Sequence, residues 1–139
     1  GAAAMKKEFT LPGVTQTLIL TRMAGRTPVP EAESIENLAK IQASMAIFLS
    51  IASIDELAKK LMTSYPKDTP AAVVYKASWP DQKIIVSTLE CIADKVKEAD
   101  INKTALVYVG RFLADEFELS KLYDKHFSHE FREAKDARR

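Results

Sequence analysis

Apolar and polar positions follow two different periods along this chain, and their alternation predicts an α/β fold. Runs rich in β-branched residues are typical of buried strands, whereas apolar residues three and four positions apart indicate helices with one buried side. The expected strands cover residues 15–22, 44–50, 71–78, 83–86 and 104–109. Helical patterns lie between most of them, so we expect a five-stranded sheet with helices packed against it.

Three helices are expected between these strands. The first covers residues 34–42. Ser53 with Glu56, and Ser87 with Glu90, have the spacing of capping boxes, in which each side chain binds a free amide at the helix start. The apolar stripes expected to face the sheet are Ile35, Leu38 and Ala39 in the first helix, Ile54, Leu57, Ala58, Leu61 and Met62 in the second, and Leu89, Ile92, Ala93 and Val96 in the third.

The limits of the domain follow from a change of composition near Gly110. Residues 10–110 carry the strand and helix patterns, and residues 111–139 are charged and aromatic, which we interpret as a partly helical, peripheral tail. Residues 1–139 are therefore expected to form a single domain. Because a native protein rarely begins Gly-Ala-Ala-Ala, we also expect the chain to start inside a longer product.

Composition and charge narrow the classes of partner. The chain has 139 residues, of which 47% are hydrophobic and 28% charged, as in ordinary globular proteins. Its net charge of +1 provides no long-range field for phosphates or anionic lipid, so we expect no nucleic acid and no membrane partner. No stretch approaches the roughly 20 apolar residues that span a bilayer. The single cysteine, Cys91, indicates a thiol-reducing compartment and hence a cytoplasmic location.

Motifs for catalysis or metal binding are scarce. The four glycines, at positions 1, 13, 25 and 110, form no phosphate-binding loop. His126 and His129 have a spacing that suits a metal site on a helix, but two surface residues are the favoured interpretation, and we predict no metal. Cys91 is expected to be a small buried thiol within a helix. No catalytic residue can be assigned from the sequence.

Residues 75–81 are the segment most suggestive of a binding site. Trp79 and Asp81 follow the third expected strand, and open α/β sheets bind ligands at such strand ends. The alternative is a Trp-Pro turn that closes an edge of the core. The residues alone favour neither.

Several segments together resemble the tetrapyrrole methylases. The nearest branch acts on precorrin-4 or cobalt-precorrin-4 at C-11 in cobalamin biosynthesis, and the likeness extends over residues 2–139. The segments that carry it are Thr10-Leu11-Pro12-Gly13-Val14-Thr15-Gln16-Thr17, Thr21-Arg22, Gly25-Arg26-Thr27-Pro28-Val29-Pro30-Glu31, Ala77-Ser78-Trp79-Pro80-Asp81-Gln82 and Ser120-Lys121-Leu122-Tyr123-Asp124-Lys125 with His129 and Arg132.

The resemblance implies a two-domain enzyme that holds S-adenosylmethionine in the cleft between its domains. This chain resembles the second domain, a mixed five-stranded sheet flanked by helices, and the glycine-rich N-terminal domain is absent. Homodimers and a corrinoid tetrapyrrole substrate are implied as well. The fragment alone is expected to be inactive or nearly so. The alternative is a non-catalytic interaction or dimerisation module derived from a methylase half.

The resemblance also suggests which residues bind the two ligands. Leu49, Ala77, Thr104 and Ala105 correspond to positions that line the cofactor pocket, although Leu49 and Thr104 depart from the commoner family residues. On the substrate side, Arg22, Arg26 and Glu31 are candidates, because arginines suit a substrate with many carboxylates. Charges that merely stabilise the loop are the alternative for these three. Methyl transfer depends chiefly on alignment of donor and acceptor, which agrees with the scarcity of catalytic motifs.

Overall fold

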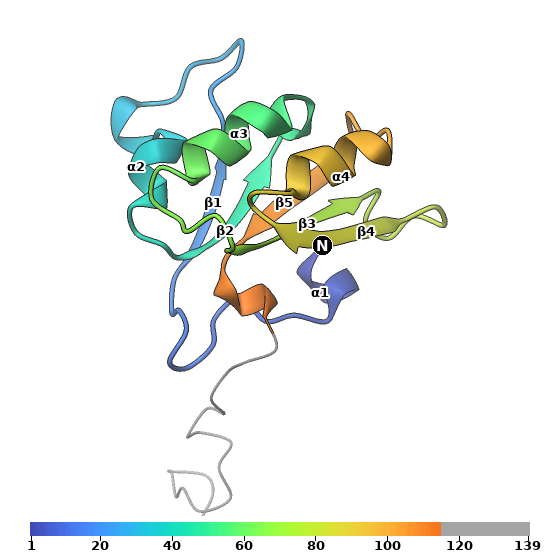
Figure 1. Cartoon of the computed structure of the whole chain (residues 1–139), viewed down its shortest axis with the longest axis horizontal. Coiled ribbons are helices and arrows are strands. Elements are labelled where there is room, and N and C mark those ends of the chain that lie inside the picture. Colours follow the sequence, from blue (N-terminus) through green and yellow to red (C-terminus); the bar gives the residue numbers. More distant parts are fainter. Residues whose placement is uncertain (115–139) are drawn as a thin grey trace, which may run out of the picture.

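A computed structural model describes residues 1–114, and its five strands form one mixed sheet (Figure 1). The sheet order is β1-β2-β5-β3-β4. Only β1 and β2 are parallel, and the pairs β2–β5, β5–β3 and β3–β4 are antiparallel. The strands are β1 Leu18–Arg22, β2 Ser44–Phe48, β3 Pro70–Tyr75, β4 Lys83–Thr88 and β5 Ala105–Val109. The α/β class and the mixed five-stranded sheet are thereby confirmed.

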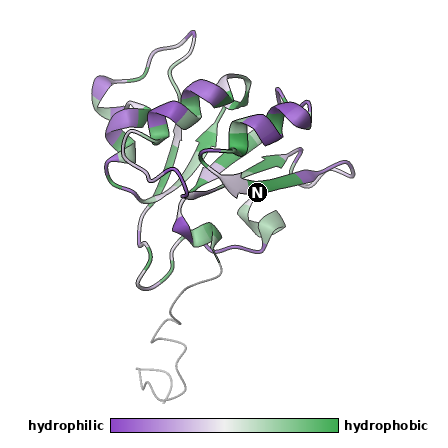
Figure 2. Ribbon diagram, viewed as in Figure 1, coloured by the Kyte–Doolittle hydropathy of each residue, from purple (hydrophilic) through white to green (hydrophobic). Residues whose placement is uncertain are grey.

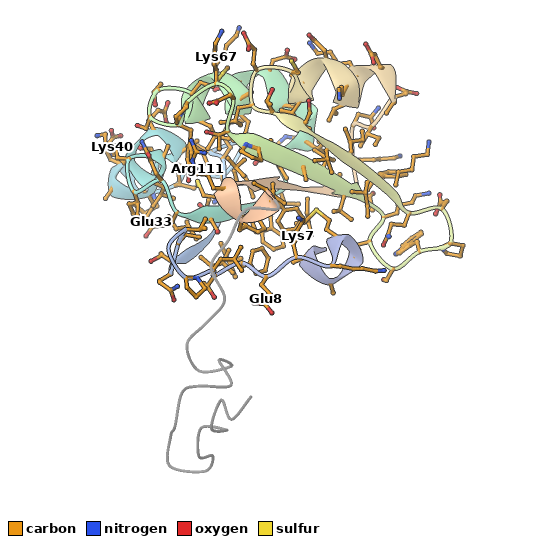
Figure 3. The ribbon with its side chains drawn as sticks, turned by 60° about the horizontal axis from the view of Figure 1, so that its bottom comes forward. Lys7, Glu8, Glu33, Lys40, Lys67 and Arg111 are labelled. Atoms are coloured by element: carbon orange, nitrogen blue, oxygen red, sulfur yellow. The ribbon has the colours of Figure 1, made fainter. Side chains whose placement is uncertain are left out.

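The longer helices cover one face of the sheet and irregular chain covers the other (Figure 1). The covering helices are α2 (Ile35–Ala39), α3 (Ile54–Leu61) and α4 (Ile92–Glu98). Across the opposite face run the short helix α1 (Ala2–Met5), the segment after it and the 3₁₀ turn η3 (Arg111–Leu113). Figure 3 shows this second side, with Lys7 and Glu8 on the segment that follows α1.

Strand alternation divides the core into two layers. Successive residues of a strand point to opposite faces, so Met45, Val73 and Val107 pack under the helices, while Tyr108 packs on the other side. Tyr108 pairs with Ala46 and Ala72 on the flanking strands. The central strands are mostly apolar and the helices are polar on their outer sides (Figure 2). The three apolar stripes expected from the sequence are buried or half-buried in the helix layer.

Phe9 anchors the N-terminal segment, which lies outside the core expected at residues 10–110 and nevertheless packs on the sheet. Its ring lies 5.9 Å from that of Tyr108 and 5.3 Å from that of Phe112. The carbonyl of Phe9 also accepts a hydrogen bond of 2.6 Å from Ser44 Oγ. Aromatic pairs at these distances are mutually attractive beyond the area that they bury. The second sheet face is therefore closed by chain on both sides of residues 10–110.

Both expected capping boxes are wrong. Ser53 ends the 3₁₀ turn η2 (Ile51–Ser53) and makes no side-chain capping bond to α3. Ser87 lies inside β4, because this strand stays paired with β3 as far as Thr88. Cys91 instead holds the position before α4 and is exposed, which corrects the expectation of a buried thiol. The spacing of Ser and Glu alone did not reveal that strand pairing would continue.

Three expected strands were too long where β2 and β3 end and β5 begins. Backbone angles leave the β region at these three points. Leu49, Lys76 and Thr104 have φ of 53°, 46° and 56°, outside the range of extended chain. β2 therefore ends at Phe48, β3 ends at Tyr75 and β5 begins at Ala105. The first strand is also shorter than expected and begins at Leu18. Of the expected tail, residues 111–114 are described and include the buried Phe112, whereas His126 and His129 lie outside the described residues.

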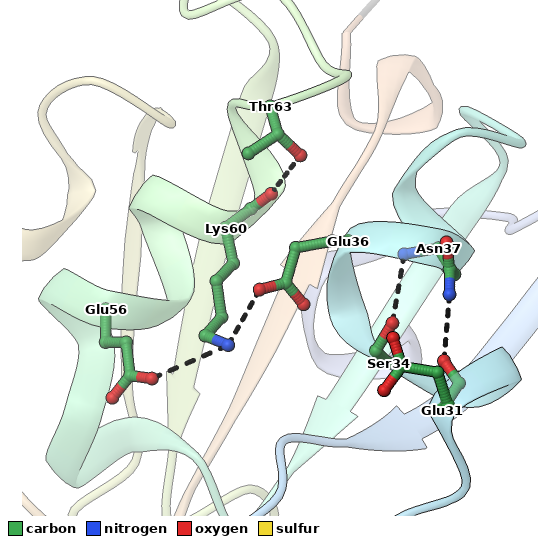
Figure 4. A network of polar contacts seen from close by, with 7 residues as sticks. All are labelled: Glu31, Ser34, Glu36, Asn37, Glu56, Lys60 and Thr63. Carbon is green, nitrogen blue, oxygen red and sulfur yellow. Dashed lines mark hydrogen bonds and ion pairs between the residues drawn. The ribbon is translucent and has the colours of Figure 1, made fainter.

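An ion pair of Lys60 joins the helices α2 and α3 of the covering layer (Figure 4). Lys60 Nζ lies 2.7 Å from Glu36 Oε1 and 3.6 Å from Glu56 Oε1. The hydrogen bond from Lys60 lowers the pKa of Glu36, and the same bond raises the pKa of Lys60. At the start of α2, Ser34 Oγ accepts a bond of 3.4 Å from the Asn37 amide, so this serine is the helix cap.

We predict that Tyr65→Phe lowers the free energy of unfolding by about 1–3 kcal/mol at neutral pH. The buried Tyr65 hydroxyl donates a bond of 2.5 Å to the Ala43 carbonyl, and phenylalanine leaves that carbonyl unpaired. Burial also raises the pKa of Tyr65 to about 12. An unfolded tyrosine loses its proton near pH 10, so between about pH 10 and 12 the native state retains a proton that the unfolded state has lost. Stability should therefore fall over that window.

Denaturant unfolding followed from pH 8 to pH 12 measures both effects. The wild-type protein should lose more stability above pH 10 than the Tyr65→Phe variant, which has no hydroxyl at this position. Parallel curves for the two proteins above pH 10 would contradict the assignment.

Candidate functional site

A groove opens at one end of the inner strands, where β2 and β3 end and β5 begins. Because β5 is antiparallel to both neighbours, its first residues lie beside their last ones. The groove has a volume of about 490 Å³, within the range of small-molecule sites. Its lining is mostly apolar and consists of Phe48, Leu49, Ile51, Ala52, Val74, Lys76, Ala77, Trp79, Asn102, Lys103, Thr104, Ala105 and Leu106.

All four residues suggested for cofactor binding line this groove. Leu49 follows β2, Ala77 follows β3, and Thr104 and Ala105 open β5. These residues are up to 56 positions apart along the chain (105 − 49), and the sheet order alone brings them together. Their convergence is a property of the fold, and their contact with a cofactor stays a prediction.

Left-handed backbone conformations concentrate around the groove. Within residues 1–114, seven non-glycine residues have positive φ, and four of them, Leu49, Lys76, Ser78 and Thr104, lie in the groove wall or the turn beside it. Such conformations cost on the order of 1 kcal/mol or more each and persist where the surroundings hold them. Clustered strain of this kind is typical of binding sites.

Ser50 holds the strained turn at Leu49. Its Oγ donates to the Phe48 carbonyl at 2.8 Å and accepts from the Met23 amide at 3.0 Å. Ser50 is buried, and its bond with the Met23 amide fixes the turn to the residue that follows β1. The Leu49 side chain is consequently held out at the groove, with 89% of its surface exposed.

The turn after β3 is tied both to β5 and to itself. The Lys76 amide donates to the Thr104 carbonyl at 2.9 Å, which joins the two groove walls. The Trp79 amide donates to the Lys76 carbonyl at 3.0 Å, and the Ser78 amide donates to Gln82 Oε1 at 2.8 Å. Trp79 is 56% exposed and lines the groove. The turn therefore does not bury Trp79 in the core, and ligand binding by residues 75–81 stays a prediction.

Lys76 is the most constrained charge at the groove. Its ammonium forms an ion pair with Asp81 and lies 5.1 Å from the ring centre of Tyr75 and 5.5 Å from that of Trp79. The hydrogen bond to Asp81 raises the pKa of Lys76, and the bond from Lys76 lowers the pKa of Asp81. Both groups are therefore ionised at neutral pH.

The three substrate-side candidates lie apart from the groove lining. Arg22 donates through Nη1 to the Thr27 carbonyl at 2.9 Å and through Nη2 to the Pro28 carbonyl at 3.1 Å, as expected of a loop-stabilising residue. Arg26 is exposed in the same loop. The Glu31 carbonyl accepts a bond of 2.8 Å from Asn37 Nδ2, which fixes the loop end to α2 (Figure 4). A role for these side chains toward substrate stays a prediction.

Several groove residues escaped the sequence analysis. Phe48, Asn102 and Lys103 were not among the candidates, although each lines the groove. Their common signal is position, since all three flank the ends of strands that meet at the groove. A sequence pattern places such residues only if the strand order is known.

Neither a cluster of metal-ligating side chains nor a membrane-spanning helix is found in the described part of the chain. Within residues 1–114, no three His, Cys, Asp or Glu side chains are grouped to hold a metal ion. Among the helices of the same residues, none has the length and apolar character needed to cross a bilayer.

Comparison with known proteins gives a consistent set of matches. The sequence model of the tetrapyrrole (corrin/porphyrin) methylases matches residues 1–93. A cobalt-precorrin-4 C(11)-methyltransferase of Methanocaldococcus jannaschii is 52% identical over 134 residues, which are 95% of this chain and 52% of that relative. The X-ray structure of a cobalt precorrin-4 methyltransferase superposes with a TM-score of 0.78 at 43% identity, covering 81% of this chain and 47% of that one.

A more distant structure shares the fold. It is the uroporphyrin-III C-methyltransferase of Thermus thermophilus in complex with S-adenosyl homocysteine, with a TM-score of 0.65 at 17% identity. The likeness covers 80% of this chain and 47% of the other. The chain thus spans about half the length of the curated relatives that it matches.

We predict that Leu49→Gly raises the free energy of unfolding by about 0.5–1 kcal/mol. Glycine adopts positive φ without the steric cost that leucine carries, and the substitution removes an exposed apolar side chain. Leu20→Gly is the matched control, since Leu20 is also exposed but lies within strand β1. There glycine should lower stability by about 1 kcal/mol. Chemical denaturation measures both variants, and equal losses would argue against strain at Leu49.

Proposed function

The chain belongs to the tetrapyrrole (corrin/porphyrin) methylases, and we propose that it is the second domain of an S-adenosylmethionine-dependent enzyme that methylates precorrin-4 or cobalt-precorrin-4 at C-11. The observation that carries the proposal is the convergence of Leu49, Ala77, Thr104 and Ala105 on one groove. The names of the relatives at 52% and 43% identity support this substrate class. This chain covers about half of each, which supports a further, N-terminal domain outside this chain.

The groove fits an adenosyl group. Its wall is mostly apolar and of suitable volume for a ligand with a flat base. Ala77 leaves room for the ligand to approach the backbone of the turn, and Leu49 and Trp79 offer apolar surface. The S-adenosyl homocysteine held by the Thermus protein supports a ligand of this class in the family.

The chemistry is methyl transfer, in which the sulfonium supplies a methyl group to a nucleophilic ring carbon and its bonding electrons stay with sulfur. The residues of this chain contribute to binding and orientation. The tethered turns at Leu49 and Lys76 fix the wall of the groove, and Thr104 and Ala105 fix its floor at the start of β5. Placement of donor and acceptor supplies much of the rate in reactions of this type.

Arg22, Arg26 and Glu31 are proposed contacts for the substrate. Arg22 ends β1, Arg26 lies on the loop that follows, and Glu31 begins the turn η1. Arginines suit the carboxylates of a corrinoid. Two guanidinium nitrogens of Arg22 already bind loop carbonyls, so Arg22 also shapes the loop, while Arg26 is exposed.

We place the whole enzyme in the cytoplasm as a homodimer. The exposed thiol of Cys91 is suited to a reducing compartment. Ile84 and Val86 are exposed on β4, an edge strand, and offer an apolar surface to a second copy. A module that serves dimerisation alone is the competing proposal, and ligand binding at the groove separates the two.

We predict that S-adenosyl homocysteine binds this chain in the millimolar range and that Ala77→Trp weakens the binding at least tenfold. A tryptophan at position 77 fills the space between Leu49 and the start of β5. Backbone amide shifts followed during NMR titration should move at residues 48–52, 76–79 and 102–106.

Ala32→Trp is the control, because Ala32 is exposed on the turn η1 (Glu31–Glu33), outside the groove. This variant should bind like the wild type. If shifts move elsewhere, or if both variants bind equally well, the groove is not the cofactor site.

We also predict that methyl transfer returns when the missing half is supplied. The half of the Methanocaldococcus jannaschii relative that this chain does not match would be fused to it. The fusion should methylate cobalt-precorrin-4, and the fusion with Ala77→Trp should lose at least tenfold in kcat/KM. Mass spectrometry of the product detects the added methyl group. A folded fusion that binds S-adenosylmethionine but never methylates the corrinoid would support the dimerisation module instead.

A further inference from the structure

The charges that line the groove are all positive. Among its lining residues in the described part of the chain, the charged side chains are Lys76 and Lys103, and no carboxylate is present. S-adenosylmethionine carries a positive sulfonium, whereas its product S-adenosyl homocysteine has a neutral sulfur. An uncompensated ammonium near the sulfur would therefore oppose the donor more than the product.

Lys76 is the more consequential of the two lysines. Its side chain is 24% exposed, so water screens its charge less than that of the exposed Lys103. The rings of Tyr75 and Trp79 hold its ammonium beside the groove. The hydrogen bond from Lys76 is the main cause of the lowered pKa of Asp81, and Lys83 at the start of β4 adds a smaller contribution and a further positive charge.

Asp81 supplies the opposing charge from just behind the groove. It pairs with Lys76 and is itself absent from the groove lining. The turn that carries Asp81 is fixed independently of this ion pair, by the bonds from the Gln82 amide to the Trp79 carbonyl and from the Ser78 amide to Gln82 Oε1. The charge of Asp81 can thus be removed while the turn keeps its own hydrogen bonds.

We propose that Asp81 is a positioning residue that neutralises Lys76, so that the groove admits a cationic methyl donor. This inference rests on the proposed function and adds a selectivity to it. Asp81 holds the ammonium against Trp79 and away from the sulfur of the ligand. Without Asp81, the groove discriminates against the sulfonium and favours the neutral product.

The test compares two ligands that differ in the charge on sulfur. Dissociation constants of S-adenosylmethionine and S-adenosyl homocysteine are measured by NMR titration of the chain, for the wild type and for Asp81→Asn. Asparagine keeps the shape of the side chain and removes one negative charge. We expect the ratio of the two constants to shift about three- to tenfold toward the product, and the shift to shrink as salt is added.

Two further variants isolate the charge. In the double variant Lys76→Met/Asp81→Asn, the ratio should return toward the wild-type value, because the ammonium is gone as well. Glu90→Gln is the matched control. Glu90 follows β4 and forms an exposed ion pair with Lys67, at the end of β3 and β4 that lies away from the groove. Its ratio should equal that of the wild type.

Each outcome decides the matter. If Asp81→Asn weakens both ligands equally, Asp81 only shapes the turn and the inference is wrong. An unchanged ratio together with unchanged affinities overturns it as well. If the wild type binds neither ligand at millimolar concentration, the proposed cofactor site itself fails, and this inference fails with it.

Discussion

The antiparallel pairing of β5 with both β2 and β3 is the constraint on which the groove depends. It sets the start of one strand between the ends of two others, so three separate chain segments meet at one edge of the sheet. A parallel β5 would present its opposite end there, and residues 102–105 would lie on the far side. The cavity and its lining thus follow from strand direction before any side chain is considered.

Helices on one side and irregular chain on the other keep this edge accessible. The helix layer packs on Met45, Val73 and Val107, and the second layer closes around Tyr108 through Phe9 and Phe112. Neither layer extends over Leu49 or Trp79, which remain exposed. The domain therefore keeps its core fully covered while apolar side chains stand at one end of the sheet, as expected of a surface that meets a ligand or another domain.

Much of this arrangement could be predicted from the residues, and the failures have a common cause. The apolar stripes of α3 and α4 were correctly expected because helical periodicity is a local property. The capping boxes failed, since Ser87 is held in β4 by pairing with Ala71 across the sheet, an interaction distant in sequence. Strand ends were overextended at Leu49 and Lys76, where tertiary hydrogen bonds hold conformations that leucine and lysine rarely adopt alone. The four cofactor candidates came from family resemblance, and local patterns would not have grouped them.

The left-handed turns at the groove also determine when its shape is established. Ser50 fixes one turn to the end of β1, and the Lys76 amide fixes the other to β5, so both are set when the sheet forms. The conformational entropy of these turns is lost during folding and is not lost again on ligand capture. This wall of the groove is thus rigid in advance, and any closure around a ligand must come from movement outside this edge of the sheet.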